Sequence, residues 1–520
     1  MTSKTDKESE KSSNRSTVDP GATASERHFD TSHLMTDLAG RSARGGLVTV
    51  SAQVVKFVLQ MGSTMVLARL LTPADFGLIA MVAVFTGFIE RFKDLGLSAA
   101  TVQRREINHD QVSTLFWINL GVSTLLMILA AAAAPLVAWF YGEEELIAVT
   151  IAISIIFLFG GLSAQHIALL RRQMRFTALA VIEIGAMLIG IVLGVTVAVL
   201  GGGYWSLVAL TAGQACATAA LSMLISGWRP GWWNISSEVK ESIGFGANLT
   251  GFNIVNYLCR NVDKLLIGRQ WGATELGVYS KAYSLLLMPV QQINGPIAAV
   301  ALPALSRLQS NGVEYRRYYL KMVQIIAYVS MPLVVVLAVL AEEVVLVLLG
   351  QQWMEAVPIF RIFAVFVVIQ NVLVTTGWVL QSMGRASRLF KWGAVQAPVF
   401  VVACFLGLPW GAQGVAIAAT IQAMVMAVPS MWVAYYDSPI AVRDVCIAVA
   451  RPAWIALALF ACTWSVLFLM NEFGLVLRLG AVVLSALSLG VCVFLLFGSV
   501  RKDLQGVFAL VRRKQAVVYP

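Results

Sequence analysis

Arg69-Leu-Leu-Thr-Pro-Ala-Asp75-Phe-Gly77 ends one long apolar segment and begins the next. Two hundred positions later, Arg269-Gln-Trp-Gly-Ala-Thr-Glu275-Leu-Gly277 does the same, with arginine, acid and glycine at matching places. Two further matches follow in the same order, Leu170–Arg175 with Leu380–Arg385 and Gly203–Ala209 with Gly411–Ile417. Three weak matches in one order at a nearly constant offset indicate a duplicated unit.

The composition is that of a membrane protein. Of 520 residues, 58% are hydrophobic and 13% charged, and the mean hydropathy is +0.77. Soluble domains carry about 25% charged residues. Residues 1–45 differ, being rich in Ser, Thr and charge, so they are predicted to be a disordered tail. This tail has no apolar region followed by a cleavage site, so it is not read as a signal peptide.

The apolar segments predict an all-α polytopic protein. A transmembrane helix needs about 20 apolar residues, and by that measure the chain has about fourteen. They lie near 47–69, 77–101, 112–140, 146–169, 176–200, 204–226, 243–268, 275–305, 318–341, 357–381, 389–408, 411–435, 450–470 and 475–498. Six spans per repeat is an even number, so the two copies have the same orientation and form a parallel repeat.

The predicted domains follow from this count. They are a tail at 1–45, a six-helix bundle at 46–228, a cytoplasmic linker at 229–242, a second six-helix bundle at 243–436, helices 13 and 14 at 437–500 and a cytoplasmic tail at 501–520. The N-terminal tail, the turns after even-numbered spans and the C-terminus hold 28 of the 38 Lys and Arg residues. Because basic residues concentrate on the cytoplasmic side, both termini are predicted to be cytoplasmic.

Charged residues inside the spans suggest a cavity. A charge at membrane depth is costly and normally faces a partner or water. The candidate substrate-binding residues are Arg260, Lys264, Lys281, Lys56, Arg361 and Arg91, and of the basic residues Arg91 and Lys93 are the weaker candidates. Together they would make a cavity positive and suited to an anion such as phosphate. Four acids are candidate proton or cation sites, Asp263, Glu90, Asp94 and Glu183. The alternative is structural pairing of acids and bases on adjacent helical turns.

Amide and aromatic residues accompany these charges, among them Gln53, Gln60, Gln292, Asn294, Tyr257 and Tyr283. They suit sugar hydroxyls and rings, although amides also hold membrane helices together. No Ser/His/Asp set, phosphate-binding glycine loop or metal cluster is recognisable, and the six cysteines form no CxxC pattern. We therefore expect no catalytic residues, no metal, no cofactor and no nucleic-acid partner, and a transporter rather than an enzyme.

The phrases at 68–104, 260–293 and 301–309 (ALPALSRLQ) resemble the polysaccharide transporter family, the Wzx-like branch that includes colanic-acid exporters. This family belongs to the multidrug/oligosaccharidyl-lipid/polysaccharide (MOP) superfamily. The resemblance covers about residues 45 to 500. It implies a MATE-like fold of two six-helix bundles plus two helices, and a flippase in the bacterial plasma membrane. The implied cargo is an undecaprenyl-pyrophosphate-linked oligosaccharide for exopolysaccharide, capsule or lipopolysaccharide synthesis. Implied partners are membrane lipids, a polysaccharide polymerase and a chain-length regulator.

Three alternatives stay open at this point. A lipid II flippase of the same superfamily would also have a basic cavity. A drug or cation antiporter of the same fold should have an acidic cavity instead. A membrane polysaccharide polymerase would need a long external loop with Arg and His, whereas the predicted external turns here are short.

Overall fold

The structure is a computed structural model that describes residues 38–90, 98, 101–102, 107–232, 257, 260–470, 477–478, 480–482 and 484–485, with side chains from residue 45 onward. All regular structure in these residues is helical. Eleven of the described helices are long and apolar enough to cross a membrane. The predicted all-α membrane architecture is therefore confirmed, while the count of about fourteen helices stays a prediction.

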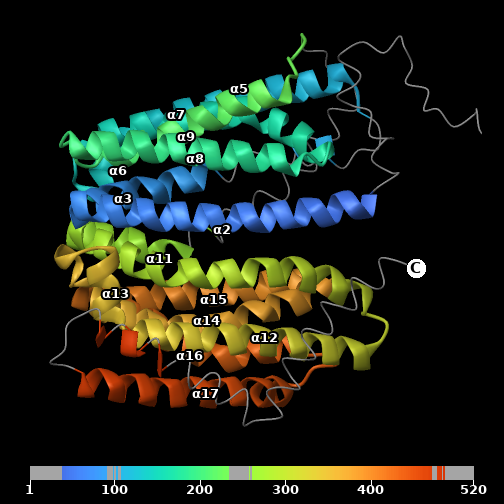
Figure 1. Ribbon diagram of the computed structural model, residues 1–520, viewed down its shortest axis with the longest axis vertical. Coiled ribbons are helices and arrows are strands. Elements are labelled where there is room, and N and C mark those ends of the chain that lie inside the picture. Colours follow the sequence, from blue (N-terminus) through green and yellow to red (C-terminus); the bar gives the residue numbers. More distant parts are fainter. Residues whose placement is uncertain are drawn as a thin grey trace, which may run out of the picture.

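The helices form two groups that lie side by side in Figure 1. We call the first the N-terminal bundle: α2 (Leu38–Leu70), α3 (Pro73–Glu90), α5 (His109–Ala132), α6 (Ala134–Tyr141), α7 (Glu145–Arg172), α8 (Phe176–Val199) and α9 (Trp205–Ser226). We call the second the C-terminal bundle: α11 (Val262–Arg307), α12 (Gly312–Val339), α13 (Ala341–Leu348), η3 (Gln351–Trp353), α14 (Ala356–Ser382), α15 (Ala386–Gly407), η4 (Leu408–Trp410), α16 (Gly411–Tyr435) and α17 (Val442–Leu469).

Some predicted boundaries fall outside the described residues. These include most of the predicted spans at 243–268 and 475–498, the linker at 233–242 and the tails at 1–37 and 501–520. Helix α2 begins at Leu38, inside the segment predicted as a tail.

Helix α11 is a hairpin of two arms. At Gly272 the backbone is non-helical, with φ 80° and ψ −173°, a conformation that glycine adopts without steric cost. The hydroxyl of Tyr279 donates a hydrogen bond of 2.8 Å to Asp263 Oδ2. In a straight helix those residues would lie about 24 Å apart. The chain therefore reverses at Gly272, and the end of the molecule that holds this turn is called the Gly272 end below.

The two bundles repeat the same local structures. Asn108 and Asn311 cap α5 and α12, and each side chain accepts a hydrogen bond from the backbone N–H three residues on. After α7 and α14 the chain turns through left-handed residues, Met174 (φ 52°) and Gly384 (φ 69°). These turns lie inside the matched segments Leu170–Arg175 and Leu380–Arg385. The two turns thus occupy equivalent places in the matched segments, while the duplication as a whole stays a prediction.

The bundles cross at the two matched glycines. A Cβ added at Gly77 would lie 1.7 Å from the carbonyl oxygen of Ala273, and one added at Gly277 would lie 1.9 Å from that of Pro73. The two contacts are reciprocal: Gly77 approaches Ala273, and Gly277 approaches Pro73, so the residues on each side are related by the same offset of 200 positions. Only a residue without a Cβ permits backbones to approach this closely.

Further contacts between the bundles gather at the Gly272 end, which holds α6 and α13 at the left of Figure 1. The last carbonyls of a helix have no partner within it. At the end of α2, Ala68 O accepts hydrogen bonds from Gln352 Nε2 at 2.6 Å and Trp353 Nε1 at 2.8 Å. Arg69 donates to Val347 O at 2.8 Å. Residues of η3 thus cap α2 from the opposite bundle, and Arg69 of α2 in turn satisfies a carbonyl near the end of α13.

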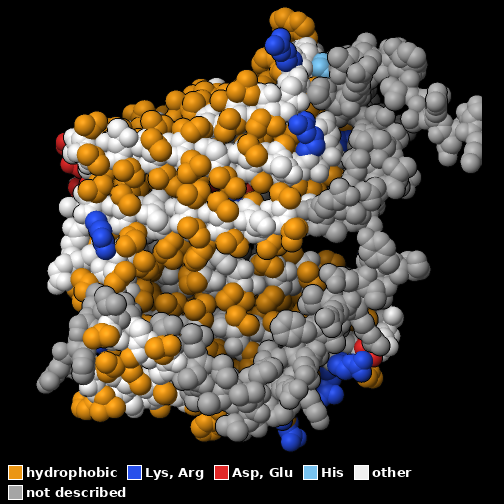
Figure 2. Space-filling view, in the orientation of Figure 1, with side chains coloured by type: hydrophobic (Ala, Val, Ile, Leu, Met, Phe, Trp, Pro, Cys, Tyr) orange, Lys and Arg blue, Asp and Glu red, His pale blue; other side chains and the backbone are white. Residues whose placement is uncertain are grey.

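The visible surface agrees with a membrane setting. In Figure 2 hydrophobic side chains cover most of the described surface of both bundles, and the visible charged side chains lie near its two ends. Exposed Trp139, Leu224 and Phe468 belong to such surface. Lipid rather than water is the medium that these side chains match.

The crossing generates a prediction. Gly77→Ala and Gly277→Ala should each destabilise the protein by about 1–3 kcal/mol, because the new methyl group overlaps backbone that cannot rotate away. Gly62→Ala on α2 is the matched control, since nothing lies within 4 Å of its added Cβ. Thermal unfolding of the purified variants measures the difference. Equal unfolding temperatures for Gly77→Ala, Gly277→Ala and the control would contradict the close crossing.

Candidate functional site

A cavity of about 410 Å³ lies between α3 and the two arms of α11. Its α3 side is apolar, with Phe76, Ile79, Ala80, Ala83 and Val84. Its other side is polar, with Tyr257, Asn261, Lys264, Ser280, Lys281, Tyr283 and Ser284. We call it the lysine cavity, and it lies at the interface of the bundles.

Lys281 reaches across this interface. Its Nζ lies 3.9 Å from the centroid of the Phe76 ring on α3. The face of an aromatic ring attracts a cation without neutralising its charge. Because the sequence places Lys281 one turn after Gly277, the close crossing of the backbones brings this lysine to α3.

Lys264 lies on the first arm of α11, where its Nζ donates a hydrogen bond of 3.2 Å to Asn261 Oδ1. The neighbouring Asp263 is buried and accepts from Tyr279. Within the described residues, neither Lys264 nor Lys281 forms an ion pair with a carboxylate. The lysine cavity therefore presents two cations without a paired acid, an arrangement that favours an anionic ligand.

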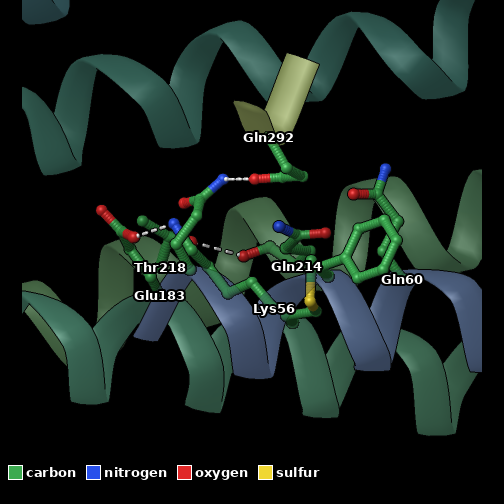
Figure 3. Close-up of a pocket in the computed structure, with 9 residues that line it drawn as sticks. Lys56, Gln60, Glu183, Gln214, Thr218 and Gln292 are labelled. Carbon is green, nitrogen blue, oxygen red and sulfur yellow. Dashed lines mark hydrogen bonds and ion pairs between the residues drawn. The ribbon is translucent and has the colours of Figure 1, made fainter. Parts of the chain in front are cut away.

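A second hollow, of about 310 Å³, lies among α2, α8, α9 and α11. We call it the glutamine groove, and it is lined by Gln53, Lys56, Phe57, Gln60, Glu183, Met187, Gln214, Thr218 and Gln292 (Figure 3). Lys56 Nζ lies 2.5 Å from Glu183 Oε2. Gln53 Nε2 donates to Gln292 Oε1 at 2.7 Å, which links the two bundles.

The structure divides the predicted residues between several places. Lys264 and Lys281 meet in the lysine cavity, and Arg260 directly precedes its lining residue Asn261. Lys56 and Glu183 instead pair with each other in the glutamine groove. Arg361 pairs with Glu342 at 3.0 Å, and neither Arg361 nor the exposed Glu90 lines either hollow. Arg91, Lys93 and Asp94 lie outside the described residues.

Some lining residues were not predicted from the sequence. In the sequence Phe76 is one apolar residue among many. Its position beside the matched Gly77 is the signal that would have predicted it to lie at the crossing. Gln214 and Thr218 are two polar residues four apart in an otherwise small and apolar segment of α9. Residues four apart share a helix face, so this spacing was the available signal.

Comparison with known proteins gives the family. The sequence profile of the family described as "Polysaccharide biosynthesis protein" matches residues 66–358, more than half of the chain. The chain belongs to this family. It is 28% identical over 365 residues to the teichuronic acid biosynthesis protein TuaB of Bacillus subtilis, covering 69% of this chain and 73% of TuaB. It is 25% identical over 376 residues to the lipopolysaccharide biosynthesis protein WzxC of Escherichia coli, covering 71% of this chain and 76% of WzxC.

Solved structures show the fold. The lipid II flippase MurJ, in an inward closed conformation, matches with a TM-score of 0.68 at 12% identity, covering 86% of this chain and 98% of MurJ. An inward-facing multidrug resistance MATE transporter of the MOP superfamily matches with a TM-score of 0.57 at 16% identity, covering 76% and 94%. The chain therefore has the fold of MOP superfamily transporters.

The Lys56–Glu183 pair generates a prediction. The side chains are 25% and 44% exposed, so their interaction is worth about 0.2–1 kcal/mol. In a double-mutant cycle of Lys56→Met and Glu183→Gln, the double variant should be less destabilised than the sum of the single variants by this amount. Unfolding of the purified proteins measures it. Strictly additive effects would show that the two side chains do not interact in the membrane-extracted protein.

Proposed function

We propose that the protein is a flippase that carries undecaprenyl-pyrophosphate-linked oligosaccharide units across the bacterial plasma membrane. The observation that carries the proposal is the lysine cavity, where two ammonium groups lie at the interface of two membrane-spanning bundles and form no ion pair with a carboxylate among the described residues. A diphosphate is the part of such a cargo that must be desolvated at membrane depth. Cations held in a cavity can donate hydrogen bonds to the phosphate oxygens in place of the water that the diphosphate loses.

The relatives support this cargo. TuaB is named for teichuronic acid biosynthesis, WzxC for lipopolysaccharide biosynthesis and ExoT of Rhizobium meliloti for succinoglycan biosynthesis transport. These names share a polysaccharide product, while the products themselves differ. A common lipid-linked carrier recognised through its phosphates would explain one cavity serving many glycans. The proposed role is that of a transporter rather than an enzyme. The proposed partners are a polysaccharide polymerase and a chain-length regulator, which would act on the transported cargo.

The proposed mechanism is alternating access between two parallel six-helix repeats, with about fourteen helices in all and both termini cytoplasmic. The Gly272 end is then external, since it holds the sparsely basic turns at Arg69 and Arg269. Contacts of Gly77, Gly277, Gln352 and Trp353 hold the bundles together at that end. This arrangement supports a state closed to the outside, from which the bundles would rock about the glycine crossing.

The lysine cavity generates the central test. Lys264→Ala and Lys281→Ala should each reduce export by about tenfold or more, because a charge-assisted hydrogen bond to phosphate contributes about 1.5–3 kcal/mol. The measurement is polymer yield, together with accumulated lipid-linked repeat unit, in host cells whose own copy is replaced by each variant.

Lys391→Ala on the exposed start of α15 is the matched control and should export normally. Membrane levels and unfolding temperatures of all variants separate lost transport from lost folding. Normal polymer yield from the Lys264→Ala/Lys281→Ala double variant would reject the phosphate-binding role of the cavity.

Coupling to an ion gradient is proposed to act through an acid, with Asp263 the best placed of the four candidates. It is 9% exposed, adjoins Lys264 in the chain and has Oδ1 without a hydrogen-bond partner among the described residues. Binding of a proton or cation there would change the field at Lys264, one residue away.

Asp263→Asn should therefore leave passive cargo exchange in proteoliposomes measurable while removing its acceleration by an imposed proton or sodium gradient. Asp110→Asn, at the exposed start of α5, is the control. Gradient acceleration that survives in Asp263→Asn would exclude this residue as the coupling site.

A further inference from the structure

We propose that the glutamine groove is a subsite for the uncharged sugar portion of the cargo, separate from the lysine cavity that takes its phosphates. The inference rests on the proposed function, because it assigns a second part of the same cargo. Gln53, Gln60, Gln214, Gln292 and Thr218 would supply the polar contacts, as the groove in Figure 3 presents them.

The charge of the groove matches a neutral ligand. Lys56 and Glu183 lie 2.5 Å apart, so the lysine and the glutamate neutralise each other. What remains are the Thr218 hydroxyl, which donates to Gln214 O at 2.8 Å and can still accept, and the amides, which both donate and accept hydrogen bonds. Sugar hydroxyls do the same, whereas phosphate oxygens only accept. The glutamine groove and the lysine cavity therefore differ in the chemistry they recognise.

Of the groove's glutamines only Gln214 lies on α9, and its amide is not required to hold α8 and α9 together. A Cβ added at Gly190 would lie 2.7 Å from Leu210 O and 2.8 Å from Gln214 Cβ, and one added at Gly194 would lie 2.8 Å from Leu210 Cβ. These glycines let the two helices pack closely through small residues, which is the common mode of association in membranes. Gln214 is thus placed over Gly190, where its side chain extends into the groove (Figure 3).

Two of the amides are left for a ligand. Gln60 and Gln214 make no side-chain hydrogen bond with the protein in the part of the chain that the structure describes. An amide in a membrane-spanning segment is stable only if it meets water or a polar partner. The hollow of about 310 Å³ is at the lower end of the size range of ligand sites. Phe57 adds an apolar surface on which the face of a sugar ring can pack.

The groove is also placed to act together with the lysine cavity. Gln292 lines the groove from the same arm of α11 that carries Lys281 into the lysine cavity. The hydrogen bond from Gln53 to Gln292 joins this arm to α2. Helix α11 therefore contributes residues to both subsites, so a single cargo with a phosphate part and a sugar part can contact this helix in both hollows.

The test is binding of two probes to the purified full chain in detergent. One probe is undecaprenyl pyrophosphate without sugar, and the other is the lipid-linked oligosaccharide fraction extracted from host cells that lack this protein. The Gln60→Leu/Gln214→Leu double variant should bind the sugar-bearing probe about tenfold more weakly, since two hydrogen bonds are lost. Its affinity for the bare pyrophosphate should change less than about twofold, a change of only about 0.4 kcal/mol.

Gln422→Leu is the matched control, because it lies on α16, 208 positions after Gln214, and lines neither hollow. It should bind both probes as the unaltered protein does. Equal weakening of both probes in Gln60→Leu/Gln214→Leu, or no weakening of either, would overturn the sugar subsite. In that case Lys264→Ala/Lys281→Ala still weakens both probes if the proposed function holds. Failure of the unaltered protein to bind either probe would overturn both proposals.

Discussion

The crossing of α3 and α11 at Gly77 and Gly277 is the constraint on which the rest of the structure depends. Added Cβ atoms there would lie 1.7 Å and 1.9 Å from carbonyl oxygens of the opposite bundle. This backbone contact fixes how far apart the two bundles lie at the Gly272 end. It also determines where the lysine cavity lies, because Phe76 and Lys281 are next to the crossing and contact each other across it. A larger residue at either glycine would separate the very elements that form the site.

The membrane setting explains why a small number of polar side chains has a large influence on how the helices pack. In a chain with 13% charged residues, each polar side chain inside a span needs a partner or a cavity. The structure uses both solutions. Asp263 is satisfied in part by Tyr279, and Glu183 by Lys56, whereas Lys264 and Lys281 line a hollow and form no ion pair with an acid in the described part of the chain. The contrast between paired and unpaired charges is what distinguishes structural residues from candidates for binding.

Two hollows of different chemistry suit a cargo with two chemical parts. The lysine cavity is positive, while the charges of the glutamine groove cancel. Shared use of the second arm of α11 means that movement of this arm would alter both at once. In a family whose members are named for different polysaccharides, separate recognition of phosphate and sugar would let one part of the site stay constant while the other varies.

The sequence by itself determined the class of protein, the helical architecture and the family resemblance, and it predicts the duplication. These follow from hydropathy, segment length and motif spacing, which are local properties of the chain. It also identified Lys264, Lys281, Lys56 and Glu183 as charges that require an explanation. Only the tertiary structure decided that Lys56 pairs with Glu183, 127 positions away, and that Asp263 turns to Tyr279 rather than to a base on an adjacent turn. Such pairings depend on how helices pack and on the reversal at Gly272, because hydropathy specifies that a segment spans the membrane without specifying which neighbour each side chain faces.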